Sequence, residues 1–307
     1  MQITPNHTER VAASSTAQPL RTVAARVKSG ARHWVGDGFH VSTYFPSGSV
    51  PSERVSPFVL MDYGPPAEFA PLAEGKRGVG WHPHRGFETV TVAFEGSVAH
   101  RDNAGHRGVI GPGDVQWMTA GAGIFHEEYH EEAFTRRGGR LHMLQLWVNL
   151  PKKFKAAAPA YQPIAAGDIP VVQLAGGGNV RVIAGDYEGT RGPARTFTPI
   201  TLLDVTLQAG ERFAVSLPEL FNASAVVASG LVATAEQRAA AGELVLFNND
   251  GSRLELAAEV DSHVLILAGE PIDEPIVQYG PFVMNTVEEI QQAAWDVNRG
   301  KFGAIPD

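Results

Sequence analysis

The chain of 307 residues contains no cysteine. This absence excludes disulfide bonds, thiolate catalysis and zinc sites of the zinc-finger type, and it fits a reducing compartment. Basic residues are also too few to give a positive chain: Lys and Arg total 25 against 33 Asp and Glu, a net charge of −8 at pH 7. That balance predicts no direct contact with nucleic acid.

Long apolar runs and a signal peptide are missing as well. No apolar stretch approaches the length of a membrane helix. The first twenty residues are polar and rich in Ser, Thr and Ala, and they lack the basic and apolar regions of a signal peptide. We therefore expect a cytoplasmic protein without membrane contact, and we predict that residues 1–25 form a flexible tail.

The residues that follow favour many short strands. The chain has 33 Gly and 21 Pro, and alternating segments recur between turn signals in both halves. This pattern predicts an all-β protein with a barrel or sandwich in each half, residues 26–160 and residues 161–307. The second half is expected to begin with a linker and to end with a short helix over 286–299, because Thr286 and Glu289 form a capping box.

Two pairs of side chains carry the chemistry of the first half. His82 and His84 stand two residues apart before a strand-like segment, and His126 and Glu128 repeat this spacing. Residues i and i+2 of a strand lie on one face, so each pair aims two donors into one pocket. Three imidazoles and one carboxylate predict a site for one divalent metal, and without sulfur they suit Fe, Mn, Ni, Co, Cu or Zn. The second half has only His263 and is predicted to lack a metal site.

Glu88 is the rival carboxylate. If its strand is regular, its face looks inward, and Glu88 is then a metal ligand, an acceptor for an imidazole N–H, or a partner of Arg85. Apolar residues assigned to the pocket walls, or otherwise to the core, are Val90, Val92, Phe94 and Trp117. Four further histidines lack paired spacing and are predicted at solvent or edge positions, with His130 kept as a candidate for proton handling: His100, His106, His130 and His142.

Several motifs resemble those of the pirin family within the cupin superfamily: HWVGDGF (33–39), HPHRGFETV (82–90), GDVQWMTAGAGIFHEE (113–128), LQLWVNLP (144–151) and QYGPFVMNTVEEI (278–290). The resemblance covers nearly the whole chain after the first twenty residues. It implies a bicupin, two tandem antiparallel β-barrels of jelly-roll type. It also implies that the family's metal ligands correspond to His82, His84, His126 and Glu128, with Fe(II) as the first choice of ion.

The resemblance implies two kinds of function. The leading hypothesis is a quercetin 2,3-dioxygenase type of enzyme that opens a flavonol-like polyphenol with O₂, in which Glu128 is catalytic and accepts the hydroxyl proton. The alternative is a metal- or redox-sensing regulator that binds a protein partner. A zinc- or manganese-dependent isomerase or decarboxylase is the third hypothesis, since the fold alone does not choose between them.

Overall fold

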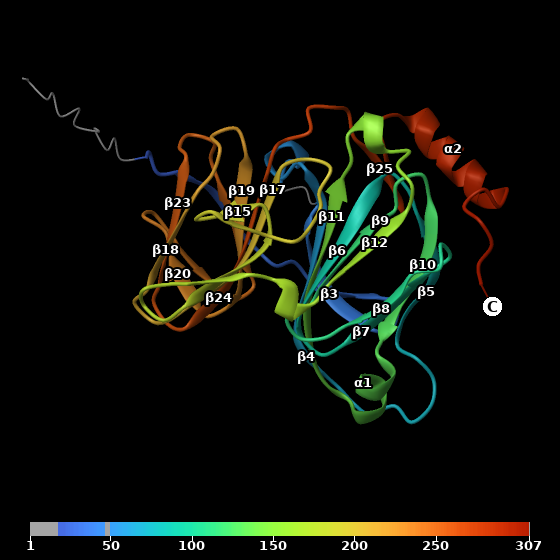
Figure 1. The fold of residues 1–307 in the computed structure, drawn as a ribbon, viewed down its shortest axis with the longest axis horizontal. Coiled ribbons are helices and arrows are strands. Elements are labelled where there is room, and N and C mark those ends of the chain that lie inside the picture. The colour runs from blue at the N-terminus through green and yellow to red at the C-terminus, as the bar shows by residue number, and fades with distance from the viewer. Residues whose placement is uncertain (1–17, 47–49, 307) are drawn as a thin grey trace, which may run out of the picture.

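Antiparallel β-strands make up nearly all of the regular secondary structure in residues 18–46 and 50–306, which the computed structural model describes. The sheets stand as four layers, with four, seven, seven and four strands in turn, so that each half is a two-sheet jelly roll (Figure 1). This confirms the predicted all-β fold with two tandem barrels and a short C-terminal helix.

The N-terminal barrel holds the predicted metal ligands. Its seven-stranded sheet has the spatial order β12 (Ala160–Ile164), β9 (Val115–Thr119), β6 (Phe87–Glu95), β11 (Gly139–Asn149), β4 (Phe58–Phe69), β3 (Phe39–Phe45) and β2 (His33–Val35). The facing four-stranded sheet has the order β5 (Gly78–His84), β10 (Ile124–His130), β7 (Val98–Asp102) and β8 (Arg107–Ile110). A short helix, α1 (Glu132–Arg137), follows β10.

The C-terminal barrel repeats this plan. Its seven-stranded sheet has the order β1 (Val23–Lys28), β22 (Glu243–Phe247), β19 (Asn222–Ser229), β24 (Ser262–Gly269), β17 (Ile200–Leu207), β14 (Asn179–Ala184) and β13 (Val171–Gln173). Its four-stranded sheet has the order β18 (Arg212–Ser216), β23 (Arg253–Ala258), β20 (Leu231–Ala233) and β21 (Arg238–Ala240). Smaller elements are β15 (Asp186–Tyr187), β16 (Thr190–Arg191) and the 3₁₀ turns Ser52–Arg54, Lys152–Phe154 and Ala166–Asp168.

A shared apolar core lies between the two seven-stranded sheets. It joins Trp117 and Leu144 of the N-terminal barrel to Leu202 and Leu265 of the C-terminal barrel, and all four side chains are fully buried. Each barrel therefore covers the outer face of the other's large sheet. As a consequence β6 is buried on both faces over most of its length.

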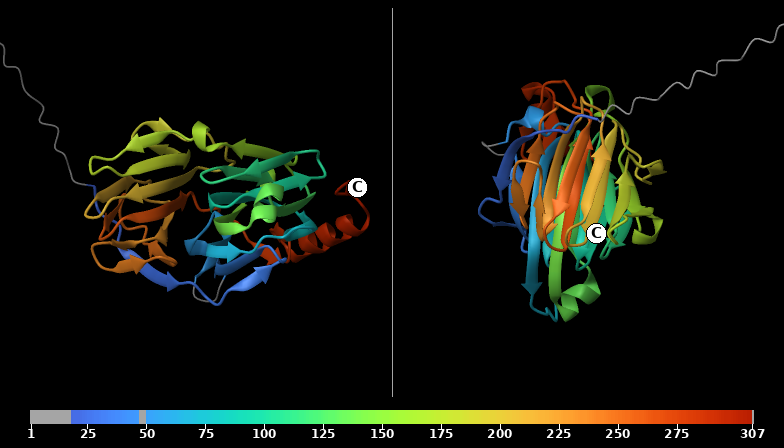
Figure 2. Two further views of the ribbon diagram at one scale, coloured as in Figure 1. Left: turned by 90° about the horizontal axis from the view of Figure 1, so that it is seen from below. Right: turned by 90° about the vertical axis from the view of Figure 1, so that its left-hand side faces the viewer.

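The chain crosses between the barrels near its start. β1 pairs with β22 of the C-terminal barrel, and the chain then runs across to β2 and β3 of the N-terminal one (Figure 2, left). At the other predicted limit, β12 pairs with β9. The limits 26–160 and 161–307 stay a prediction, and the predicted tail lies outside the described residues as far as residue 17.

The end of the chain returns to the N-terminal barrel. β25 (Val277–Tyr279) and β26 (Phe282–Met284) form a hairpin, and α2 (Val287–Asn298) follows with the predicted capping box of Thr286 and Glu289. Apolar side chains of this segment pack on Phe125 of β10, and Arg85 is paired with Asp296 of α2 at 2.8 Å. The C-terminal segment (residues 276–303) thus lies beside the strands that carry the predicted ligands.

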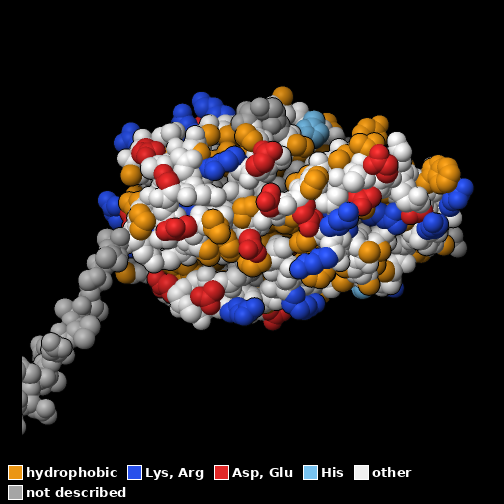
Figure 3. All heavy atoms as spheres, turned by 90° about the horizontal axis from the view of Figure 1, so that it is seen from above, with side chains coloured by type: hydrophobic (Ala, Val, Ile, Leu, Met, Phe, Trp, Pro, Cys, Tyr) orange, Lys and Arg blue, Asp and Glu red, His pale blue; other side chains and the backbone are white. Residues whose placement is uncertain are grey.

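Acidic and basic side chains are interspersed over both barrels on the face that Figure 3 shows. Within the described residues, no helix has the length and apolar character needed to cross a membrane.

Candidate metal centre

Three of the four predicted ligands meet across one pair of strands. In the antiparallel pair of β5 and β10, His82 lies opposite His126, and His84 lies opposite Ile124. Their candidate ligand atoms all lie within 4.8 Å of one another, and the His82 and His126 ring centroids are 4.2 Å apart. His84 and His126 are buried, while His82 is half-buried and leaves one side of the cluster accessible.

Hydrogen bonds fix how two of these imidazoles point. Nδ1 of His82 lies 2.8 Å from the Gly80 carbonyl oxygen, and Nδ1 of His84 lies 3.3 Å from that of Pro281. Because a carbonyl oxygen only accepts, each Nδ1 carries a proton and donates it, so that Nε2 is the nitrogen of each ring left for a metal. Pro281 belongs to the C-terminal segment, so this segment orients a predicted ligand.

The charge state of the buried imidazoles suits a cation. Burial lowers the pKa of His84 and of His126 well below the usual range, and repulsion from His82 acts in the same direction. Both rings are therefore neutral at pH 7, which is the form that binds a metal.

Glu128 is close to His126 but is held by other side chains. Its ligand atoms group with those of His100 and His126, not with the three-histidine cluster. One carboxylate oxygen accepts from Gln145 Nε2 at 3.0 Å, and the other accepts from Gln116 Nε2. Neither glutamine was predicted as a site residue, although each is a lone amide within a run of apolar side chains, VQWM and LQLWV.

The prediction for the face of Glu88 is wrong. Val90, Val92 and Trp117 lie in the core between the barrels, with Phe94 packed against it, and Glu88 shares their side of β6 and accepts a 2.7 Å hydrogen bond from Thr119. Thr91, on the opposite side, contacts the amides of Gln116 and Gln145 beside Glu128. Alternation separates two faces but does not say which one looks into the pocket, and both faces of β6 are buried.

The walls beside the cluster are aromatic. Phe87 and Trp147 stack on each other with ring centroids 4.2 Å apart, and they lie 5.0 and 5.1 Å from the His84 ring. Phe87 and Trp147 thus form the pocket wall that the sequence suggested for Val90, Val92, Phe94 and Trp117. They exclude water from the buried side of the cluster.

The prediction of solvent or edge positions is wrong for three of the four remaining histidines. His100, His130 and His142 are buried, and only His106 is partly exposed. His130 contacts the Gly38 carbonyl oxygen at 2.7 Å and packs among phenylalanines, away from the cluster. His100 lies beside His126, with 3.3 Å between their Nδ1 atoms.

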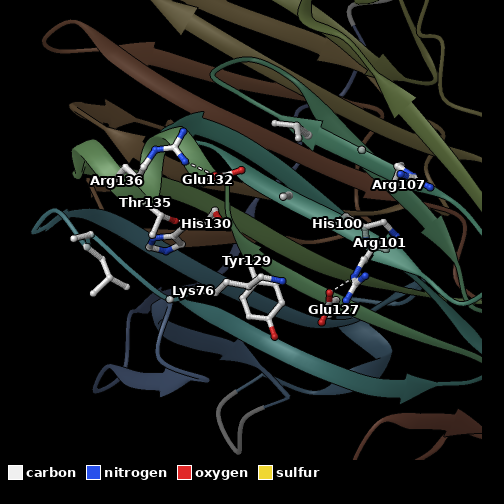
Figure 4. Close-up of a pocket in the computed structure, with 16 residues that line it drawn as sticks. Lys76, His100, Arg101, Arg107, Glu127, Tyr129, His130, Glu132, Thr135 and Arg136 are labelled. Carbon is white, nitrogen blue, oxygen red and sulfur yellow. Dashed lines mark hydrogen bonds and ion pairs between the residues drawn. The ribbon is translucent and has the colours of Figure 1, made fainter. Parts of the chain in front are cut away.

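A separate pocket of about 690 Å³ lies on the outer face of β7 and β10. Figure 4 shows Arg101, Glu127 and Tyr129 at its surface, with Arg101 paired to Glu127. Along their strands these side chains alternate with His100, His126 and Glu128, which face inward. None of the four predicted ligands lines this pocket.

Two jelly-roll barrels in tandem, one of them with a histidine cluster on two paired strands, define a bicupin protein. Residues 38–148 match the pirin family and residues 202–303 match the pirin C-terminal cupin domain. The chain is 50% identical over 272 residues to a Pseudomonas aeruginosa protein named "putative quercetin 2,3-dioxygenase", covering 88% of this chain and 94% of that one. It therefore belongs to the pirin family, as its motifs predict.

Other relatives agree with this assignment. A pirin-like protein of Caulobacter vibrioides is 40% identical over 286 residues, covering 92% of this chain and all of the relative. A crystal structure titled as quercetin 2,3-dioxygenase from Acinetobacter baumannii superposes with a TM-score of 0.89 at 44% identity. That match covers 94% of this chain and 100% of the other.

Proposed function

We propose that this protein is a metal-dependent dioxygenase that opens flavonol-like substrates with O₂ at His82, His84, His126 and Glu128. The observation that carries the proposal is the convergence of three imidazoles within 4.8 Å on two paired strands. The names of the Pseudomonas and Acinetobacter relatives support the substrate class and the reaction.

The donor set fits a divalent metal. The tautomers of His82 and His84 leave Nε2 bare, and the buried Nε2 of His126 has no hydrogen-bond partner among the described residues. Imidazole and carboxylate ligands without sulfur suit Fe(II), which we take as the first choice, and also Zn, Mn, Ni, Co and Cu. A bound divalent ion would supply Lewis acidity toward the 3-hydroxyl of a flavonol.

Glu128 is suited to accept the hydroxyl proton. Gln116 and Gln145 hold its two oxygens from β9 and β11, so the carboxylate is fixed while it remains an acceptor. Substrate would approach from the half-buried side of His82, since Phe87 and Trp147 close the side of His84. In this arrangement Glu128 takes the proton at one of its two carboxylate oxygens, beside His126.

Oxygen uptake tests the proposal. Protein reconstituted with Fe(II) should consume O₂ with quercetin, and His126→Ala should lose both bound metal and turnover. His33→Ala is the matched control, because His33 is exposed on β2 and should leave both unchanged. Full metal occupancy without oxygen uptake over a panel of flavonols would contradict the enzyme and favour the metal-sensing alternative.

A further inference from the structure

A chain of polar side chains leads from His126 to the protein surface. His126 Nδ1 lies 3.3 Å from His100 Nδ1, and His100 Nε2 lies 3.4 Å from Asp102 Oδ2. Asp102 in turn contacts the partly exposed ring of His106 at 2.9 Å. We infer that Asp102 and His100 are positioning residues that fix the tautomer of His126 so that its Nε2 lone pair is left free to bind a metal.

The carboxylate of Asp102 sets which atoms donate and which accept along these hydrogen bonds. Asp102 is fully buried, and Oδ1 accepts from the backbone N–H groups of Ala104 and His106 at 3.0 and 2.9 Å. Burial alone would raise its pKa, but hydrogen bonds from His100 and His106 more than offset this, and the pKa lies below the ordinary value. Asp102 is therefore an ionised acceptor, and the nitrogen that faces it must carry a proton.

The proton positions then follow along the chain. A neutral His100 that donates from Nε2 has a bare Nδ1, and this nitrogen can only accept from His126 Nδ1–H. His126 then keeps Nε2 bare, which is the buried atom without a hydrogen-bond partner in the described structure. The opposite tautomer of His100 would place a bare Nε2 against the Asp102 carboxylate, so that two acceptors would face each other without a hydrogen bond.

His100 is suited to this role by its packing. Its ring is fully buried and stacks on Tyr161, with centroids 4.7 Å apart and planes 12° from parallel. The ring therefore keeps its orientation between Asp102 and His126. The ligand atoms of His100 also group with those of His126 and Glu128. Both of its ring nitrogens are hydrogen-bonded, to Asp102 and to His126, so we assign His100 a positioning role and not that of a metal ligand.

His126 differs in this respect from the other two imidazoles. Backbone carbonyls of Gly80 and Pro281 fix His82 and His84, and no substitution changes their acceptor character. The tautomer of His126 depends on side chains alone. Outer partners of this kind typically change metal affinity by about 10–100-fold when they are replaced.

The substitution Asp102→Asn reverses the donors and acceptors along these hydrogen bonds without removing a heavy atom. The amide oxygen of the variant stays with the two backbone N–H groups, so its NH₂ group faces His100 Nε2. His100 must then accept at Nε2 and donate from Nδ1, and His126 must carry its proton on Nε2. That proton occupies the position from which His126 would bind the metal.

The test uses the full chain and two readouts. Long-range ¹H–¹⁵N spectra of the metal-free protein should place the His126 proton on Nδ1 in the wild type and on Nε2 in Asp102→Asn. Zn²⁺ titration should show affinity falling about 10–100-fold in Asp102→Asn. His100→Gln offers an amide oxygen to His126 and should retain more Zn²⁺ affinity than His100→Phe, which keeps only the stacking.

Asp114→Asn is the matched control. Asp114 also accepts two backbone N–H groups within this barrel, from Gly111 and Ala166, and no imidazole is among its hydrogen-bond partners. An unchanged His126 tautomer in Asp102→Asn, or an equal loss of Zn²⁺ affinity in Asp114→Asn, would overturn the inference.

The inference rests on the proposed metal centre, yet the two can fail separately. A wild-type protein that binds no Zn²⁺ and no Fe(II) would refute the proposed function. The tautomer change would still be seen in the metal-free spectra and would support the hydrogen-bond chain.

Discussion

Glu88 places a carboxyl group in the apolar core between the barrels, and its pKa makes the stability of the protein depend on pH. Its side chain is 1% exposed, one oxygen accepts from Thr119, and the other has no partner among the described residues. Burial raises the pKa of Glu88 to about 7, and the Thr119 hydrogen bond offsets this only in part. We predict that Glu88→Gln keeps metal binding intact and removes a pH-dependent loss of stability.

The sign follows from proton binding. Between the ordinary pKa of 4.5 and the folded pKa of about 7, the folded protein holds a proton that the unfolded chain has released. Stability from Glu88 is therefore fully present below pH 4.5 and is lost as the pH rises to 7. The shift corresponds to about 3 kcal/mol, most of which is lost between pH 5 and 8.

Urea unfolding of the metal-free protein at pH 5 and pH 8 measures this contribution of Glu88 to the free energy of unfolding. Relative to the wild type, Glu88→Gln should gain about 2–3 kcal/mol in free energy of unfolding between the two pH values. The cost of burying an amide is common to both and cancels in the difference. Glu68→Gln, on the exposed side of β4, should show no such gain. A Glu88→Gln difference that does not change with pH, or a loss of bound metal, would refute the reasoning.

Three further predictions follow from the packing around the site. Leu144→Ala, in the fully buried core between the barrels, should cost about 2–5 kcal/mol in urea unfolding. Gly86→Ala should cost at least about 1 kcal/mol and expose the C-terminal segment to protease, because Gly86 has φ +88° and a Cβ there would lie 2.0 Å from the Val283 carbonyl oxygen. Gln145→Leu removes a donor to Glu128 and should lower Zn²⁺ affinity about 10–100-fold in a titration.

The sequence was sufficient where the signal is local. The spacing of His82 with His84 and of His126 with Glu128 predicts shared faces; β5 and β10 bring His82, His84 and His126 together, while Glu128 groups with His100 and His126. The capping box at Thr286 likewise needs only neighbouring residues. Such patterns depend on backbone geometry within a few residues, which the chain carries in its own order.

The sequence was insufficient where the signal depends on what covers a strand. Glu88 was assigned to the pocket because its face is apolar, but the second barrel buries that face. His100 was assigned to solvent because it lacks a paired histidine, although Asp102 stands two residues away and meets it within the barrel. The two-residue spacing of His100 and Asp102 is the one sequence signal that could have predicted the hydrogen bonds that support His126.

The second barrel has no histidine cluster among its described residues, yet it takes part in building the centre. Its large sheet covers the outer face of β6, and the chain that leaves it returns Pro281 to orient His84. The donor atoms thus come from two local motifs, while the orientation of His84 comes from a distant segment. A barrel with the same two motifs but without the Pro281 carbonyl would hold His84 in mixed tautomers, and only part of that population would present a bare His84 Nε2 beside the other two imidazoles. The second half of the chain therefore contributes a contact to the proposed metal site and does more than add a structural domain.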